Sequence, residues 1–255
     1  RLTSTAKVGW SSSITFATVG TALSTLVIVP GLSVLFSVLL GRDLSAPDPV
    51  RIACASALAS VVLGVAVGVV ARAATDRWLG GFEQACTARR FDAAYWLGVS
   101  AMPMLLALIT GITNLGVAAA YAGFGGSLDG SLSMLVRSVT LLPLALMAGV
   151  CLGVFAAGLG LYLSDPYLGG TILGALLPIS VGVIVPVDAY PAWLAALCTL
   201  VPGGRTIALV SGSSEMVDST VVTEVLVCVL WALAGLVLVH AAARRIRSGA
   251  RTNLL

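Results

Sequence analysis

Long apolar segments separated by short polar stretches repeat along the whole chain. An α-helix rises about 1.5 Å per residue, so it needs about 20 apolar residues to cross the roughly 30 Å hydrocarbon core of a bilayer. Six segments approach or reach this length, which predicts an all-α membrane protein with a single transmembrane domain over residues 1–255. The predicted spans cover residues 18–40, 52–70, 97–120, 141–163, 168–185 and 221–239.

The composition agrees with a membrane protein and argues against several kinds of active site. Of 255 residues, 58% are hydrophobic and 10% are charged, whereas about a quarter are charged in an ordinary soluble domain. A single histidine, His240, and five scattered cysteines without a CxxC spacing predict no metal site. Lys7 is the only lysine, and it belongs to no glycine-rich phosphate loop. We therefore expect no catalytic residues and no cofactor bound by this chain.

The basic residues are distributed unevenly between the two sides of the predicted bundle. An even number of spans brings both chain ends to one side, and ten of the fourteen basic residues fall there. Cytoplasmic loops are richer in Lys and Arg than outer ones, so both termini are predicted to be cytoplasmic. This charge suits anionic lipid headgroups. We expect membrane lipids as partners, and no nucleic acid.

The segment between the second and third predicted spans, residues 72–96, is long and unusually charged. Its sequence, ARAATDRWLGGFEQACTARRFDAAYWLG from Ala71 to Gly98, interleaves arginines and acids with Trp78 and Phe82. At helical spacing these residues form an apolar strip beside a charged one. The pattern predicts a short cytoplasmic helix that lies either along the membrane or against a protein partner.

Prolines interrupt the apolar sequence before the last predicted span, at Pro178, Pro186, Pro191 and Pro202. Between the last two of these, only the ten residues AWLAALCTLV are continuously apolar, and ten cannot cross a bilayer. We therefore predict a re-entrant or interfacial helical elbow on the outer side, over residues 186–210, whose broken backbone is shielded by protein. Tyr190 and Trp193 suit headgroup depth, either as plain interface anchors or in contact with a substrate.

A few polar residues inside the predicted spans are candidate functional groups, because such residues are costly in a bilayer. Asn114, with Thr113 beside it, lies well inside the third span, where it either bonds another helix or lines a pathway. Arg137 and Glu224 lie near the outer ends of the fourth and sixth spans. Snorkelling or a mutual ion pair explains these two charges, and a place on the pathway is the alternative.

The charged stretch DRWLGGFEQ, from Asp76 to Gln84, precedes the proline-rich stretch PISVGVIVPVDAYPAWL, from Pro178 to Leu194. The first resembles the E-R-x-x-G-x-L-E element of the type-two permease family of ATP-binding-cassette exporters. The second is similar to that family's P-x-S-G-x-x-x-P-x-x-x-x-P-x-W signature, and the resemblance is closest to daunorubicin-resistance-like permeases. It covers essentially the whole chain, although Asp76 replaces the usual Glu, Phe82 replaces Leu, and SVG replaces Ser-Gly.

The resemblance implies that the chain is one half of a homo- or heterodimeric permease in a bacterial plasma membrane. Separate ATPase subunits would bind ATP and Mg²⁺, and the helix after the second span would dock on them. A hydrophobic or amphipathic drug, lipid or peptide would be exported, as in antibiotic resistance or lipid transport. The residues assigned to ATPase coupling are Asp76, Arg77, Trp78, Gly80, Phe82, Glu83, Arg89 and Arg90.

Three other classes of protein share some of these features. An ion-driven secondary transporter would need buried carboxylates near the midplane and usually paired repeats with broken helices, and the sequence indicates neither. A membrane enzyme acting on lipids would need clustered His, Asp or Glu residues, which a single histidine disfavours. A non-transporting assembly subunit of a membrane complex stays open as an alternative.

Overall fold

The computed structural model describes residues 18–46, 48–82, 93–124, 128–163, 165–210, 212 and 217–247. These residues form helices and turns and contain no strand. In chain order the elements are α2 (Val19–Leu23), a π-helical turn η2 (Ser24–Ile28), α3 (Val29–Asp43), α4 (Pro49–Trp78), α6 (Ala93–Phe124), α7 (Leu128–Tyr162), α8 (Leu168–Ser180), a 3-10 turn η3 (Val187–Ala189), α9 (Ala192–Cys198), α10 (Gly204–Ala208) and α11 (Val217–Arg247).

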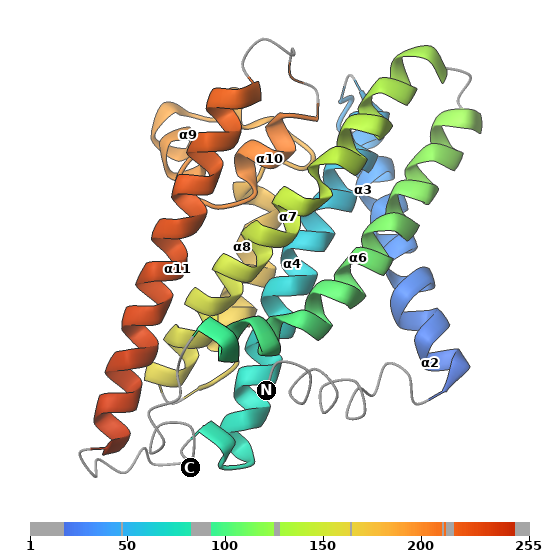
Figure 1. The fold of residues 1–255 in the computed structure, drawn as a ribbon. Coiled ribbons are helices and arrows are strands. Elements are labelled where there is room, and N and C mark those ends of the chain that lie inside the picture. The colour runs from blue at the N-terminus through green and yellow to red at the C-terminus, as the bar shows by residue number, and fades with distance from the viewer. Residues whose placement is uncertain are drawn as a thin grey trace.

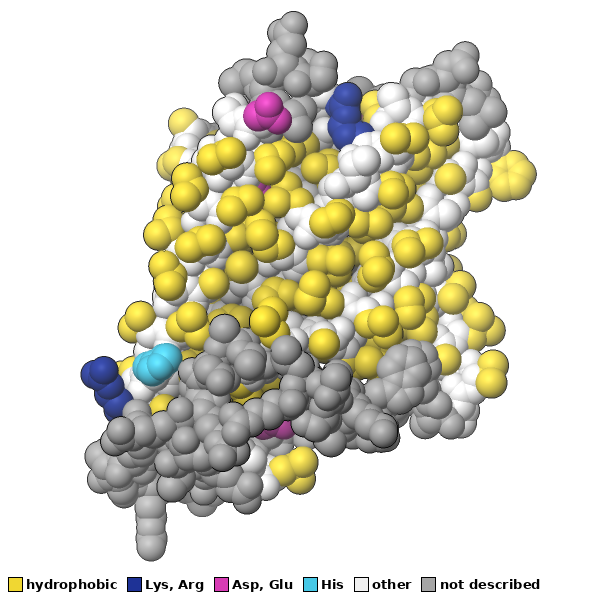
Figure 2. Space-filling view, viewed as in Figure 1, with side chains coloured by type: hydrophobic (Ala, Val, Ile, Leu, Met, Phe, Trp, Pro, Cys, Tyr) yellow, Lys and Arg dark blue, Asp and Glu magenta, His cyan; other side chains and the backbone are white. Residues whose placement is uncertain are grey.

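Five helical segments in this part of the chain are long and apolar enough to cross a membrane. They are Val19–Asp43, Pro49–Trp78, Tyr95–Phe124, Ser131–Tyr162 and Asp218–Arg245. The prediction of an all-α, multi-pass membrane protein is therefore confirmed at this level. Figure 2 shows hydrophobic side chains over the middle of the visible face, with the charged side chains in view gathered toward its two ends.

The fifth predicted span differs from the structure. A helix was expected over residues 168–185, but α8 ends at Ser180 after 13 residues, a length of about 20 Å. The chain then turns through Gly182, whose φ of +70° lies in the left-handed region that favours glycine. Pro186 follows four residues later and cannot donate a helical hydrogen bond. The run is apolar enough to cross, but its backbone cannot stay helical.

Helix α4 is the centre of the bundle. It packs against α3, α6, α7 and α8, while α11 packs against the far side of α7. Its most apolar stretch is 72% buried, compared with 22–50% for the other four long segments. The elbow helices α9 and α10 lie at one end of the bundle (Figure 1). At the opposite end α4 and α11 end and α2 begins (Figure 1).

Small residues on α7 let it approach α4 closely. A Cβ atom at Gly149 would lie 2.8 Å from the Val62 carbonyl oxygen, and one at Gly153 would lie 3.1 Å from the Ala66 Cα atom. Both contacts are with backbone, which cannot move aside as a side chain can. Because lipid gives helices no hydrophobic reason to associate, such close backbone packing is a main source of their attraction.

We predict that Gly149→Ala destabilises the bundle by about 1–3 kcal/mol, because the added methyl group overpacks the α4–α7 contact. Gly116→Ala on α6 is the matched control, since a Cβ atom there meets nothing within 4 Å. Thermal unfolding of both variants in the same detergent checks the prediction. Equal unfolding temperatures would show that the contact contributes little.

Candidate functional site

The first candidate site is the elbow between α8 and α11, where the helical backbone is broken. The Gly182 turn follows α8, and η3 and the seven-residue α9 come next. The five-residue α10 starts after Gly203, which has a φ of +96°. A Cβ atom at Gly182 would lie 3.0 Å from the Val187 backbone nitrogen, so the turn is also closely packed. Neither α9 nor α10 is long enough to cross a bilayer.

Arg51, in the first turn of α4, satisfies the carbonyl groups that this break exposes. Its side chain is buried, and it donates hydrogen bonds to the carbonyl oxygens of Gly182 at 3.0 Å and Val183 at 3.4 Å. Asp48 caps the same end of α4 by accepting the N–H groups of Val50 and Arg51, each at 3.0 Å. In the sequence, Arg51 is one of the four basic residues on the predicted outer side, and the sequence indicates no partner for it. Its position directly before the apolar run 52–70 was the available signal.

Glu224, on α11, bonds the other side of the elbow. It is fully buried, and its Oε1 atom accepts the backbone N–H of Gly203 and the Thr206 hydroxyl, the latter at 3.3 Å. The expected snorkelling does not describe this buried carboxylate. The expected ion pair with Arg137 is also wrong, because Arg137 instead donates to the Gly212 carbonyl oxygen.

Other side chains bond carbonyl groups of the elbow and of the last turn of α8. The Tyr190 hydroxyl donates to the Ile179 carbonyl oxygen at 2.9 Å, and the Trp231 indole donates to that of Leu200 at 2.7 Å. Burial raises the pKa of Tyr190 above its ordinary value. Tyr190 therefore has a structural bond as well as its predicted interfacial position.

The remaining predicted elbow residues differ in exposure. Pro186 and Pro191 are exposed, as is Trp193, which has 67% of its surface accessible. Pro202 is buried beside the left-handed Gly203. Trp193 is thus the one large aromatic side chain of this candidate group that is available for contact with lipid or a partner.

The second candidate site is the opposite end of α4, where the residues predicted to couple to an ATPase lie. Asp76 accepts the Tyr95 hydroxyl at 3.0 Å and lies 3.8 Å from the Arg72 Nε atom. Arg77 is buried and donates to the carbonyl oxygens of Gly160 and Leu163, both at 3.0 Å, at the end of α7. Arg77 therefore joins two helices within the chain instead of forming a polar rim for a partner.

The two aromatic residues predicted as a shared docking anchor have different environments. Trp78, the last residue of α4, is 62% exposed. Gly80 follows in a left-handed turn with a φ of +73°, and Phe82 then packs into the core with 1% of its surface exposed. The structure corrects the joint anchor, because Phe82 is covered by this chain. Glu83, Arg89 and Arg90 lie outside the described residues.

The predicted pathway residues do not come together as one group. Asn114 is fully buried and donates to the Ser60 hydroxyl of α4 at 2.7 Å, so it bonds another helix, one of its two expected roles. Thr113 donates to the Ile109 carbonyl oxygen of its own helix at 3.0 Å. Arg137 and Glu224 bond the segments before α11. Sequence position placed Thr113, Asn114 and Glu224 inside predicted spans and Arg137 just before one, but it could not give their partners.

Comparisons with known proteins identify no relative. No protein-family model matches the sequence, and searches of curated proteins and of solved structures also return no match. Within the described ranges, no group of three His, Cys, Asp or Glu side chains could hold a metal ion. The candidate sites are therefore assessed from their own geometry.

We predict that Glu224→Leu destabilises the protein by about 1–3 kcal/mol, because it leaves the buried Gly203 N–H without an acceptor. Glu224→Gln keeps a side-chain oxygen for this N–H and is expected to be as stable as the wild type, or more so, since it buries no charge. Thermal unfolding in one detergent measures both. Equal stability of the Leu and Gln variants would contradict a structural role for this bond.

Proposed function

We propose that this chain is the transmembrane subunit of an ATP-binding-cassette exporter, paired with a second permease half and driven by separate ATPase subunits. The observation that carries the proposal is where the two family-like elements lie. The stretch from Asp76 lies at the end of α4, and the stretch from Pro178 forms the end of α8 and the elbow, at the other end of the bundle. This arrangement supports an ATPase contact on one side of the membrane and an exit on the other.

The surface at the end of α4 suits a docking partner. Trp78 and Leu79 are 62% and 78% exposed, beside the Arg72–Asp76 ion pair. An exposed aromatic residue with charged groups around it is the usual composition of an interface hot spot. Under this proposal Trp78 is the apolar anchor for the ATPase. Arg77 and Phe82 fix the end of α4 that carries it.

The structure also offers a mechanical connection between this surface and the elbow. Helix α4 is continuous over 30 residues, about 45 Å. Trp78 ends this helix, and Arg51 in its first turn bonds the carbonyl groups at the end of α8. A displacement of α4 by an attached ATPase would therefore act directly on the elbow. The cargo would be hydrophobic or amphipathic, since few charged residues lie between the helices.

One observation favours an ion-driven secondary transporter as a second candidate. Glu224 is a fully buried carboxylate on a transmembrane helix, the type of group that carries protons or cations in such transporters. Its bond to Gly203 gives it a structural reason to be there. Transport that survives Glu224→Gln, a change that removes the titratable group, would exclude this candidate.

Trp78→Ala is expected to lower ATPase co-purification and export by tenfold or more, because truncating a central interface aromatic commonly costs about 2 kcal/mol. Trp193→Ala is the matched control, since Trp193 is similarly exposed, at 67%, but lies in the elbow. Co-purification from cells and export assays measure both variants. Full ATPase retention in Trp78→Ala, or an equal loss in Trp193→Ala, would contradict the coupling role.

The proposed topology predicts that the elbow faces outward and that the end of α4 faces the cytoplasm. In a background without the native cysteines, a cysteine replacing the exposed Asp188 should react with an impermeant reagent in intact cells. A cysteine replacing the exposed Leu79 should react only after permeabilisation. The reverse labelling pattern would invert the topology.

A further inference from the structure

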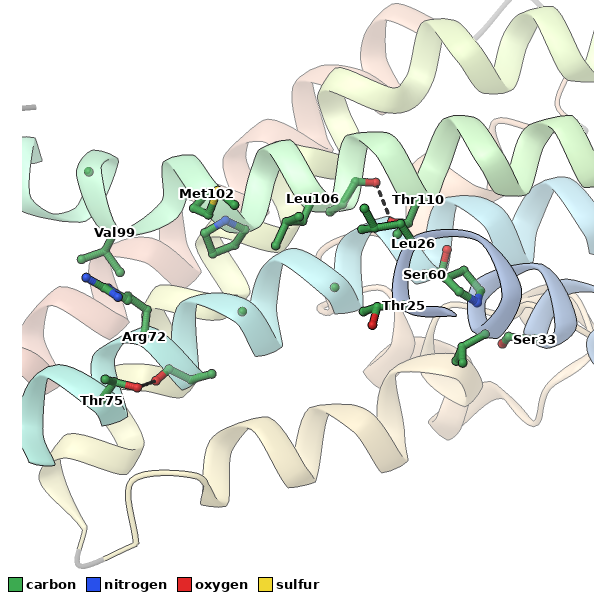
Figure 3. A pocket seen from close by; sticks show the side chains of 18 residues that line it. Thr25, Leu26, Ser33, Ser60, Arg72, Thr75, Val99, Met102, Leu106 and Thr110 are labelled. Carbon is green, nitrogen blue, oxygen red and sulfur yellow. Dashed lines mark hydrogen bonds between the residues drawn. The ribbon is translucent and has the colours of Figure 1, made fainter. Parts of the chain in front are cut away.

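A cavity of about 510 Å³ lies between the first transmembrane segment, α4 and α6, apart from the two sites described above. Figure 3 shows Val99, Met102 and Leu106 of α6 on one side of it and Arg72 and Thr75 of α4 at one end. Gly64 and Gly68, which also line it, add no side-chain bulk. This volume is in the range of ligand-binding cavities.

The cavity is mostly apolar although several hydroxyl groups line it. The Ser60 hydroxyl donates to the Ala57 carbonyl oxygen at 2.7 Å, that of Thr110 to Ala107 at 3.0 Å, and that of Thr75 to Ala71 at 2.9 Å. The protons of these three hydroxyls are used within their own helices, and Thr25 and Ser33 of the first segment also line the cavity. The lining therefore presents mainly aliphatic surface to an occupant between Ser60 and Arg72.

Its depth matches one leaflet of a bilayer. The 20 residues between Arg51 and Arg72 on α4 carry no charge, and these two arginines lie about 32 Å apart along the helix axis, close to the hydrocarbon thickness. Arg72 is thus at the boundary between hydrocarbon and headgroups. Ser60, at the deep end, lies about 18 Å from Arg72 along α4. A phospholipid acyl chain reaching from headgroup depth to the bilayer centre would fill this length.

The cavity is accessible from the side of the bundle near Arg72. The lining residues of the first segment lie between Thr25 in η2 and Ser33 in α3, and none comes from α2. Helix α2 diverges from α4 and α6 below this point (Figure 1). Among the described residues, the walls near Arg72 therefore come from α4 and α6, and an opening between them would let an acyl chain enter from the surrounding leaflet.

The charges at the mouth of the cavity indicate which headgroup it suits. Arg72 lines the cavity, and Asp76 lies one helical turn further out, with 22% of each side chain exposed. In an aminophospholipid the phosphate follows the acyl chains and a primary ammonium lies beyond it. This order of negative and positive charge complements the order of Arg72 and Asp76. A guanidinium has five donors, so it can bind a phosphate while it faces a carboxylate.

We propose that this cavity binds one acyl chain of a phosphatidylethanolamine-type lipid from the adjacent leaflet, with its phosphate at Arg72 and its ammonium at Asp76. This inference concerns binding within one chain and does not depend on the proposed exporter function. It assigns a lipid site to the face of α4 opposite the elbow contacts. Arg72 and Asp76 would bind the headgroup of this lipid.

The test is native mass spectrometry of the delipidated full-length protein, titrated separately with phosphatidylethanolamine, phosphatidylcholine and phosphatidylglycerol of matched chains. We expect one phosphatidylethanolamine to bind about tenfold more tightly than the other two, as hydrogen bonds to charged groups allow. Asp76→Asn should remove this preference, and Arg72→Gln should weaken all three lipids. Arg244→Gln on α11 is the control for general surface charge and should change nothing.

A steric variant tests the cavity itself. Ala71→Phe places a large side chain in the lining at a half-buried position and should reduce binding of all three lipids. Headgroup preference is a ratio measured on a single protein, so it does not depend on the yield of a variant. Equal binding of the three headgroups, tightest binding of phosphatidylglycerol, or a preference unchanged by Asp76→Asn would overturn the proposal.

Discussion

A backbone group that is freed where a helix breaks and is buried away from water must find a partner within the protein. The rest of this structure depends on that constraint at the end of α8. Arg51 of α4 donates to the freed carbonyl groups of Gly182 and Val183, and Glu224 of α11 accepts the N–H of Gly203. These two buried residues thus form hydrogen bonds with backbone groups and do not form an ion pair with each other. The elbow can be non-helical only because α4 and α11 flank it with these side chains.

The same solution occurs at the other end of α4. Arg77 donates to the carbonyl oxygens of Gly160 and Leu163 at the end of α7, where the helix dipole concentrates negative charge. An arginine at each end of α4 therefore bonds the end of a different neighbouring helix. Between them, Gly149 and Gly153 bring the α7 backbone against α4. Helix α4 is consequently fixed to α7 along most of its length, and it also packs against α8.

Much of the fold could be predicted from the sequence, because apolar run length and helical rise are local properties. Five of the six predicted spans correspond to long helices, and the prolines correctly marked a region of short helices. Helix α8 is shorter than predicted because the chain turns at Gly182. The length of the apolar run does not reveal this turn. Arg51, Arg77 and Glu224 were misread for a different reason. Their partners are backbone atoms of distant segments, which residue type and spacing do not encode.

Different faces of α4 contact different parts of the protein. One face meets the glycines of α7, another lines the cavity from Ser60 to Arg72, and the two ends carry the contacts of Arg51 and Trp78. A helix with its backbone bonds intact moves nearly as a rigid body, so a displacement of α4 at Trp78, as the proposed function requires, would change the cavity and the Arg51 bonds together. Under the two proposals, occupancy of the cavity and the position of the elbow would thus be coupled through α4.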